Sequence, residues 1–231
     1  MSQIPTIIEN KGLSFGWLTI LLSIVTFVLA GITIGFELTE SVVGVYIFKP
    51  LTTATIIIIA LIALRPPTFQ YKWMVLFGLG FSLVGDILLM MPQDWFLFGL
   101  IAFLVAQIFY TIAFSSVKGF YTSVIGAIPF VVIGFIMGFI LWPNLGEMRV
   151  PTMVYMVVIL VMGWQALGQW RQTGERRALL AFVGALLFIL SDSLLAIDRF
   201  ATPMVLSRLL VLGTYYPAQW LISLSTGSKH P

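Results

Sequence analysis

The stretch GLGFSLVGDILLMM, residues 78–91, places a carboxyl group inside an apolar run long enough to belong to a membrane span. One helix face collects the small and polar residues at positions i, i+4, i+7 and i+8: Gly78, Ser82, Gly85 and Asp86. Small residues on such a face let a neighbouring helix approach closely. A carboxylate at membrane depth is costly unless it faces a bundle interior, a partner or trapped water. The stretch therefore predicts a spanning helix with Asp86 directed into a helix bundle.

A second stretch of the same kind follows about a hundred residues later. Residues 184–197 read GALLFILSDSLLAI, with Ser191 and Asp192 in the places of Gly85 and Asp86. A single intramembrane carboxylate could belong to a structural ion pair with a lysine or an arginine. Two carboxylates in matching settings favour a functional pair instead.

The composition is that of a membrane protein. Of 231 residues, 60% are hydrophobic and 9% are charged, whereas a soluble domain carries about 25% charged residues. The absence of cysteine excludes disulfides and thiolate metal sites, and the single histidine, His230, excludes a histidine-based zinc site. We therefore expect no metal and no cofactor. The net charge of +3 comes from cations at segment ends, so nucleic acid is not an expected partner.

Apolar segments of about 20 residues, each long enough to cross a bilayer, recur along the chain. They predict an all-α, polytopic membrane protein with eight transmembrane helices in a single domain, residues 1–231. Residues 1–16, which precede the first predicted span, are expected to form a short tail. The predicted spans cover residues 17–36, 43–64, 73–91, 96–116, 122–142, 152–170, 178–197 and 204–225.

The cations are distributed unequally between the two sides that eight spans define. Eight lie on the side of the N-terminus and three on the other, with Lys49 inside a span. By the positive-inside rule, this distribution predicts an integral protein of a bacterial cytoplasmic membrane with both termini cytoplasmic. The eight cations are Lys11, Arg65, Lys72, Lys118, Arg171, Arg176, Arg177 and Lys229, and the three are Arg149, Arg199 and Arg208.

Short matches between the two halves indicate an internal repeat. Three pairs keep the same order with offsets of 109, 106 and 112 residues: Val45-Tyr46 with Val154-Tyr155, Gly85-Asp86 with Ser191-Asp192, and Ala106-Gln107 with Ala218-Gln219. They predict two four-helix repeats, about residues 17–116 and 122–225, which are parallel because each has an even number of spans. Chance is the alternative for each match, and the common order favours duplication.

The polar residues of the predicted spans share the outer half of the bilayer. Asp86 and Asp192 each precede the outer end of their span by five residues, roughly 7–8 Å. This placement predicts a polar cavity that opens outward. The residues expected to bind substrate there are Lys49, Tyr46, Gln107, Tyr155, Arg199, Tyr215 and Gln219.

Five of these side chains also have a structural explanation. Lys49 could extend along its stem to the interface, and Tyr46 and Tyr155 could be interfacial aromatic residues. Gln107 and Gln219 could join helices by hydrogen bonds without contacting a substrate. The sequence leaves these alternatives open.

Several motifs together resemble the lysoplasmalogenase family, also called YhhN-like membrane proteins. They include Lys49-Pro50-Leu51, residues 81–86, residues 184–188, Ser191-Asp192-Ser193 and Thr214-Tyr215-Tyr216. The resemblance implies hydrolysis of the vinyl ether bond of lysoplasmalogens, with a lysophospholipid and membrane lipid as partners and Asp86 and Asp192 as catalytic residues. Many relatives have histidine at the position of Gln107, so a shared role as proton carrier is not implied there.

Two carboxyl groups suit this reaction. Protonation of the β-carbon of a vinyl ether gives an oxocarbenium ion, to which water adds, and the hemiacetal then collapses. The reaction needs a general acid, activation of water and a nearby negative charge. The neighbours favour Asp86 as the acid, because Ser191 and Ser193 could support a charged Asp192. A proton-coupled transporter or a lipid-binding membrane protein would use the same paired aspartates.

Overall fold

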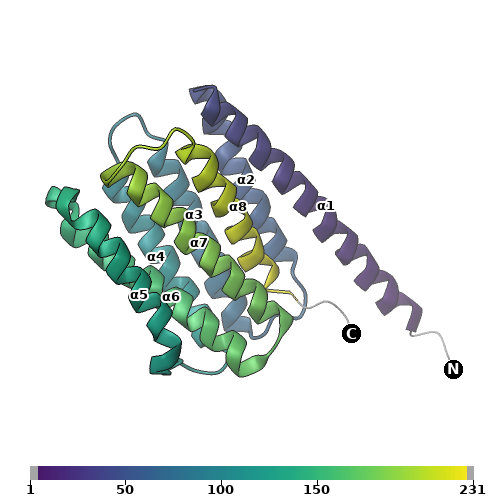
Figure 1. The fold of residues 1–231 in the computed structure, drawn as a ribbon. Helices are drawn as coiled ribbons and strands as arrows, with labels where there is room; N and C mark the ends of the chain where they lie inside the picture. Colours follow the sequence, from purple (N-terminus) through teal and green to yellow (C-terminus); the bar gives the residue numbers. More distant parts are fainter. Residues whose placement is uncertain (1–4, 228–231) are drawn as a thin grey trace.

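A computed structural model describes residues 5–227, with side chains from residue 16 onward. Over that part of the chain, all regular structure is helical. The described residues form eight α-helices: α1 Pro5–Leu38, α2 Val42–Ile62, α3 Phe69–Leu89, α4 Phe96–Ser115, α5 Val124–Leu141, α6 Arg149–Thr173, α7 Arg176–Phe200 and α8 Ser207–Leu224 (Figure 1). Two short 3-10 helices, Trp142–Asn144 and Gly146–Met148, connect α5 to α6.

The prediction of an all-α polytopic membrane protein is confirmed. Within the described residues, seven helices are long and apolar enough to cross a membrane. The exception is α8, which has 18 residues and packs against α7, α1 and α2. Its polar residues lower its hydropathy, and several of them face the interior, as the site below shows.

Local interactions define where the helices begin and end. The Thr68 side chain accepts a hydrogen bond from the Tyr71 backbone N–H at 2.9 Å, which fixes the start of α3. Lys72 Nζ donates to the carbonyl oxygens of Leu61 at 2.7 Å and Ala63 at 2.8 Å, so it satisfies free carbonyls at the end of α2. Gly174, with φ of 64°, ends α6 in the left-handed conformation.

Several helix boundaries differ from the sequence prediction; α3, for example, ends at Leu89 rather than at Met91. The expected tail is helical from Pro5, because proline is tolerated in the first turn of a helix; residues 1–4 of that tail lie outside the described part. The helix α7 continues to Phe200 rather than ending at Ile197, because charged residues such as Asp198 do not by themselves end a helix. Asp192 consequently precedes its helix end by eight residues and Asp86 by three, so the equal offset of five residues is wrong.

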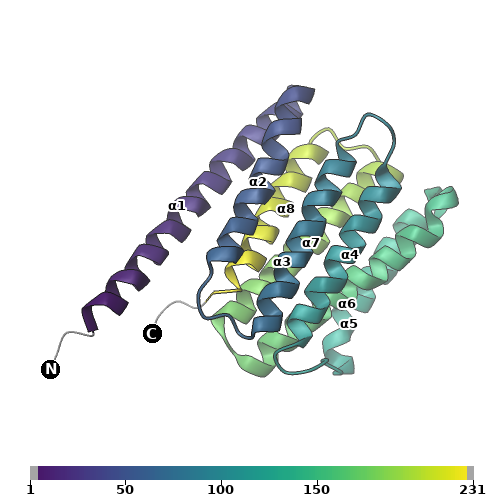
Figure 2. The ribbon, with the colours of Figure 1, turned by 180° about the vertical axis from the view of Figure 1, so that it is seen from behind.

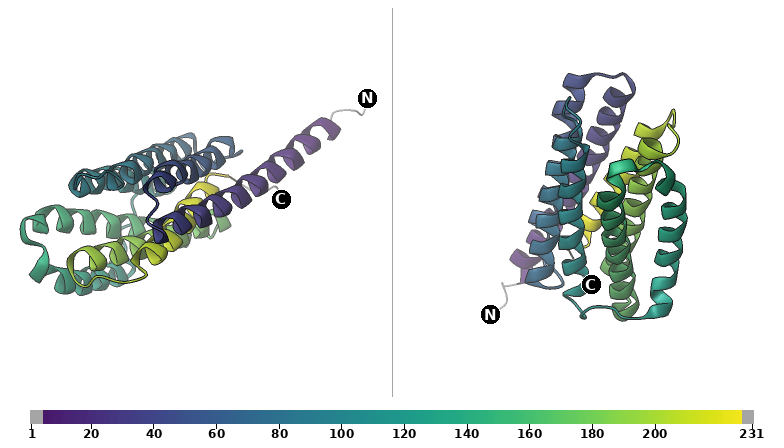
Figure 3. Two further views of the ribbon diagram at one scale, coloured as in Figure 1. Left: turned by 90° about the horizontal axis from the view of Figure 1, so that it is seen from above. Right: turned by 90° about the vertical axis from the view of Figure 1, so that its left-hand side faces the viewer.

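Six helices form a closed ring. In order around it they are α2, α3, α4, α6, α7 and α8, and each packs against its two neighbours. Helices of the first half lie on one side and those of the second half on the other (Figure 3). Outside the ring, α1 packs on α2 and α8, and its N-terminal part projects away from the bundle (Figure 2). The helix α5 packs on α6 and α7.

Glycines at corresponding positions bring two helix pairs together. A Cβ at Gly78 would lie 2.3 Å from the Tyr110 ring, so α3 and α4 can approach only without a side chain there. A Cβ at Gly184 would lie 2.9 Å from the Ala218 carbonyl oxygen, which sets the same limit on α7 and α8. The helix neighbours in the two halves correspond in the same way, and this arrangement supports the repeat, which stays a prediction.

Aromatic rings fill the space between α4, α7 and α8 at the level of the aspartates. Phe103, Phe188 and Tyr215 form a triangle with centroid separations of 6.2, 5.9 and 5.8 Å. A Cβ at Gly85 would lie 2.6 Å from the Phe103 ring, so α3 also packs closely here. The core beside Asp86 is therefore packed with side chains.

Candidate active site

Asp86 lies inside the ring, with 2% of its surface exposed. Its Oδ2 accepts hydrogen bonds from Thr53 Oγ1 of α2 at 2.7 Å and from the Tyr215 hydroxyl of α8 at 2.9 Å. Thr53 lies one helical turn beyond Lys49, whose positive charge attracts the Asp86 carboxylate. Two hydroxyl donors and a cation therefore surround this buried carboxyl group.

Asp192 has the corresponding position on α7, but it is only partly buried. Its Oδ2 accepts a hydrogen bond from the Tyr155 hydroxyl of α6 and a weaker one from Gln107 Nε2 of α4 at 3.3 Å. The nearest charged influence on it is Asp86, which repels it electrostatically. The two carboxyl groups therefore interact electrostatically. Each accepts one hydrogen bond from the preceding helix of its own half and one from the last helix of the other half.

A second polar layer lies next to the aspartates. Gln219 Nε2 donates to Ser82 Oγ at 2.9 Å, and its Oε1 accepts from the Tyr110 hydroxyl at 2.6 Å. Ser82 and the Tyr110 hydroxyl are themselves 3.5 Å apart. This layer joins α3, α4 and α8, and its members are fully buried.

Charged residues gather at the end of the bundle nearer the aspartates. Lys49, 8% exposed, lies 3.8 Å from Glu37 Oε1. Arg208 contacts Glu37 at 3.7 Å and Glu40 at 3.8 Å. We call Glu37, Glu40, Lys49 and Arg208 the charged cluster. It links α1, α2 and α8 at the end of the bundle nearer Asp86.

A separate ion pair lies at the same end and involves α7, the helix that carries Asp192. Arg199 of α7 donates to Asp94 Oδ2 at 2.5 Å, and its guanidinium lies 5.1 Å from the centroid of the Phe96 ring. Phe96 also contacts Phe200 edge to face, with centroids 5.6 Å apart. These contacts tie the start of α4 to the end of α7.

Most residues predicted to bind substrate are brought together. Tyr155 and Gln107 contact Asp192, Tyr215 contacts Asp86, and Gln219 lies in the second polar layer, while Lys49 and Arg199 lie at the charged end. Tyr46 differs: it is 37% exposed on α2, a position that suits the interfacial explanation.

Two residues of the site were missed in the sequence. Thr53 is one of several threonines on a β-branched, apolar helix, and its position one turn after Lys49 was the signal that could have identified it. Glu37 was overlooked because it ends the first apolar run, where an exposed charge is ordinary. Its contact with Lys49 depends on the sharp turn between α1 and α2.

The reason for preferring Asp86 as the acid is wrong. Ser191 Oγ donates to the Val211 carbonyl oxygen at 3.0 Å, and Ser193 Oγ donates to the Ile189 carbonyl oxygen at 2.7 Å. Both serines are therefore engaged by backbone and leave Asp192 without their support. The hydroxyl donors belong instead to residues distant in sequence, and Asp86 has more of them than its neighbours suggested.

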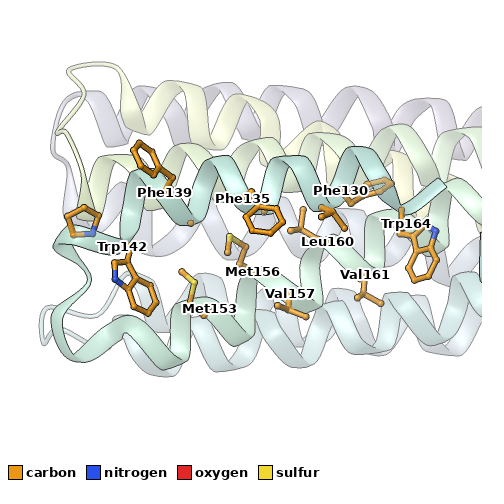
Figure 4. Close-up of a pocket in the computed structure, with 15 residues that line it drawn as sticks. Phe130, Phe135, Phe139, Trp142, Met153, Met156, Val157, Leu160, Val161 and Trp164 are labelled. Atoms are coloured by element: carbon orange, nitrogen blue, oxygen red, sulfur yellow. The ribbon is translucent and has the colours of Figure 1, made fainter. Parts of the chain in front are cut away.

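A groove of about 850 Å³ runs between α5 and α6 on the outside of the ring. Its lining includes Phe130 and Phe135 of α5 and Met156 and Leu160 of α6, with Trp142 and Trp164 toward its ends (Figure 4). The lining is apolar throughout, as expected of a surface in contact with hydrocarbon. It carries no titratable side chain for chemistry.

The site is built from carboxyl, hydroxyl and amide groups. Among the described residues, no group of three or more histidine, cysteine, aspartate or glutamate side chains is arranged to hold a metal ion. The arrangement can exchange protons, orient water and stabilise a positive charge through the two carboxyl groups.

Known proteins match the part of the chain that holds this site. Residues 44–226, which span α2 to the end of α8, match the sequence profile of the YhhN family. The chain belongs to this family. Both aspartates and every hydrogen-bond partner described for them lie within the matched range.

Curated relatives fall into two groups by name. Bovine lysoplasmalogenase TMEM86A is 39% identical over 158 residues, which cover 64% of this chain and 62% of the relative. Human lysoplasmalogenase TMEM86B is 34% identical over 161 residues, 69% of this chain and 66% of the relative. The uncharacterized membrane protein YhhN of Escherichia coli O157:H7 is 35% identical over 150 residues, 64% of this chain and 70% of the relative. No solved structure matches the chain.

Proposed function

We propose that this protein hydrolyses the vinyl ether bond of lysoplasmalogens, with Asp86 and Asp192 as the catalytic residues. The products are a fatty aldehyde and a glycerophospho-alcohol such as glycerophosphoethanolamine or glycerophosphocholine. The observation that carries the proposal is the pair of carboxyl groups, on corresponding helices, that share one site inside the ring. The names of the bovine and human relatives support it.

The surroundings of the two carboxyl groups favour Asp192 as the proton donor. Asp192 is the more accessible of the two to a substrate. Among the described residues, the charged group that acts on it is Asp86, and this repulsion favours a neutral carboxyl group at Asp192. Asp86 has Lys49 and two hydroxyl donors, which fit a carboxylate. This assignment reverses the one that the neighbouring serines favoured.

The steps then follow from these two states. The Asp192 carboxyl proton is transferred to the β-carbon of the vinyl ether, whose π electrons form the new C–H bond, and the α-carbon and ether oxygen share the positive charge. The Asp86 carboxylate stabilises that oxocarbenium ion. Water adds to the α-carbon and returns a proton to Asp192. The hemiacetal hydroxyl then loses its proton as the bond between the α-carbon and the ether oxygen breaks, and the ether oxygen takes up a proton, which releases the aldehyde and the free glycerol hydroxyl.

The charged end of the bundle favours one orientation of the substrate. The vinyl ether of a lysolipid lies just below its phosphate, and Lys49 and Arg199 lie at the end of the bundle nearer the aspartates. The phosphate would therefore meet these cations while the alkenyl chain points toward the apolar interior of the membrane. Because Phe103, Phe188 and Tyr215 pack tightly, chain entry requires these rings to move.

The decisive experiment measures aldehyde release by the purified protein in detergent from a synthetic lysoplasmalogen. The expected result is stoichiometric aldehyde and glycerophospho-alcohol, with no turnover of the saturated 1-alkyl analogue. Binding of the lysolipid without aldehyde release would favour a lipid-binding protein. Proton flux in proteoliposomes that depends on a co-substrate, without hydrolysis, would favour the proton-coupled transporter.

We also propose that the charged end faces outward and that both termini are cytoplasmic. The opposite end carries six cations in its turns and adjoining helix ends: Arg65, Lys72, Lys118, Arg171, Arg176 and Arg177. Because the chain has no native cysteine, Asn144→Cys and Thr202→Cys can be labelled singly in intact cells, with Thr122→Cys as the control at the opposite end. If an impermeant maleimide labelled Thr122→Cys alone, the proposed orientation would be the wrong way round.

A further inference from the structure

The side-chain amide of Gln107 is a part of the site that the proposed chemistry leaves unused. Gln107 is fully buried on α4, and its Nε2 donates to Asp192 Oδ2 at 3.3 Å. Its Oε1 is also buried, yet it has no hydrogen-bond partner among the residues that the structure describes. An unpaired buried acceptor costs about 1–3 kcal/mol, so a donor that pairs with it on binding would be strongly favoured.

Of the four buried glutamine side chains among the described residues, Gln107 and Gln169 have an unpaired Oε1, and the other two have both amide atoms paired. Gln219 has both amide groups paired, with Tyr110 and Ser82. Gln165 of α6 is equally paired: its Oε1 accepts from the Tyr121 backbone N–H at 2.7 Å, and its Nε2 donates to the Tyr121 carbonyl oxygen at 3.1 Å. Of the two unpaired acceptors among the described glutamines, Gln107 Oε1 is the one whose amide contacts a proposed catalytic carboxyl group.

We propose that Gln107 Oε1 accepts a hydrogen bond from the free hydroxyl on the second glycerol carbon of the substrate, and that Gln107 thereby selects lysolipids. This inference rests on the proposed function. In a lysoplasmalogen, two carbon atoms separate that hydroxyl oxygen from the ether oxygen. The group that holds the hydroxyl must therefore lie beside the group that protonates the vinyl ether, and Gln107 lies beside Asp192.

The same contact discriminates against a lipid with two chains. When the second glycerol carbon is acylated, its oxygen carries no hydrogen to donate. An ester oxygen would then face the Gln107 acceptor. A site built to hydrogen-bond a substrate hydroxyl rejects analogues that lack it, because its own buried group stays unpaired. Selection at this position would consequently appear in the relative rates of analogues rather than in the rate of any one substrate.

The test compares substrates and variants together. Wild-type protein, Gln107→Leu and Gln107→Glu are each given a 1-alkenyl-glycero-3-phosphocholine with its 2-hydroxyl, the 2-deoxy analogue and the 2-methoxy analogue. We expect the wild type to favour the 2-hydroxy lipid by about tenfold or more in kcat/KM. Gln107→Leu should cut this preference to about twofold or less, whereas Gln107→Glu, which keeps an acceptor, should retain it.

Gln165→Leu is the matched control, since it removes a buried amide from the other end of the bundle. It should keep the wild-type preference. If Gln107→Leu slowed the 2-hydroxy and 2-deoxy lipids equally, Gln107 would act on the reaction common to both and the inference would be overturned. Cleavage of none of the three by the wild type would overturn the proposed function itself, and the inference with it.

A binding measurement covers the case in which a variant is folded but inactive. Saturated 1-alkyl analogues with and without the 2-hydroxyl cannot be hydrolysed by protonation and can compete with a fluorescent lysolipid. The wild type should bind the 2-hydroxy analogue more tightly, and Gln107→Leu should bind the two equally. An unchanged difference in Gln107→Leu would again overturn the inference.

Discussion

Asp86 and Asp192 occupy corresponding helices but different surroundings. Asp86 is almost fully buried, accepts two hydrogen bonds from hydroxyls and lies near Lys49. Asp192 is partly exposed, is bonded by Tyr155 and Gln107, and has the other aspartate as its charged neighbour. A nearly symmetric frame thus holds two chemically unequal carboxyl groups.

The difference shows how one frame can provide an acid and a base. Two neighbouring carboxyl groups in identical surroundings could share one proton, but nothing would decide which of them holds it, whereas unequal surroundings do. Here the inequality comes from the partners: Thr53 and Lys49 of α2 on one side, Tyr155 of α6 and Gln107 of α4 on the other. Each prediction below tests one part of that inequality.

The largest effect is expected from the carboxyl groups themselves. Asp86→Asn and Asp192→Asn should each lower kcat by on the order of 10²–10⁴, because each removes an acid–base or charge-stabilising group. Rates of aldehyde release are measured from acid to alkaline pH. The activity of the wild type should fall at high pH as the proton donor is lost, and this alkaline decline should be absent from the residual activity of Asp192→Asn alone.

Asp94→Asn serves as the matched control, because it neutralises a carboxyl group at the same end outside the ring. It should keep the pH profile of the wild type. If both site variants lost activity equally at every pH, with monodisperse protein in each case, the assignment of Asp192 as the acid would have no support.

The hydroxyl donors should give the next largest effect. Tyr155→Phe and Tyr215→Phe each remove one hydrogen bond to a carboxyl group, and each should lower kcat on the order of tenfold to a hundredfold. Tyr155→Phe should also move the alkaline decline, since it changes the surroundings of the proton donor. If the pH at which activity declines shifted in Tyr215→Phe but not in Tyr155→Phe, the proposed roles of the two aspartates would have to be exchanged.

The sequence predicted the class of fold and the two central residues because both depend on local patterns. Apolar length defines a span, and an aspartate within one is conspicuous wherever it lies, so Asp86 and Asp192 could be named in advance. The predicted equal offset of the two aspartates from their helix ends was wrong, because it placed those ends at Met91 and Ile197, whereas α3 ends at Leu89 and α7 continues through Asp198 to Phe200.

The roles of the aspartates also depend on long-range packing. Thr53 and Tyr215 donate to Asp86 from positions 33 and 129 residues away, and the sequence around neither of them identifies Asp86 as the partner. The serines next to Asp192, which local reasoning used, bond the backbone instead. Reasoning from adjacent residues therefore favoured a different acid from the one that the hydrogen-bond partners favour, because a helix directs neighbouring side chains to different faces.

Lys49 tests whether the charge beside Asp86 also serves the substrate. Lys49→Ala should raise KM for a lysolipid by about tenfold, because a charge-assisted contact with the phosphate is lost. A smaller decrease of kcat should accompany it, since Lys49 also lies near Asp86. Glu37→Gln, which loosens Lys49 without removing it, should leave KM closer to the wild-type value. If Lys49→Ala lowered kcat and left KM unchanged, the role of Lys49 would be limited to supporting Asp86.

Arg199 should give the smallest effect, because its ion pair is exposed and an exposed pair is worth about 0–1 kcal/mol. If Arg199 leaves Asp94 to meet the substrate phosphate, Arg199→Ala should raise KM by roughly two- to fivefold and leave kcat unchanged. Asp94→Asn frees the same guanidinium and should lower KM or leave it unaltered. Arg176→Ala at the opposite end is the control, and a larger KM effect there than at Arg199 would place substrate entry at the other face. Opposite signs for Arg199→Ala and Asp94→Asn would show that the Arg199 guanidinium, as well as the lysine near Asp86, holds the head group.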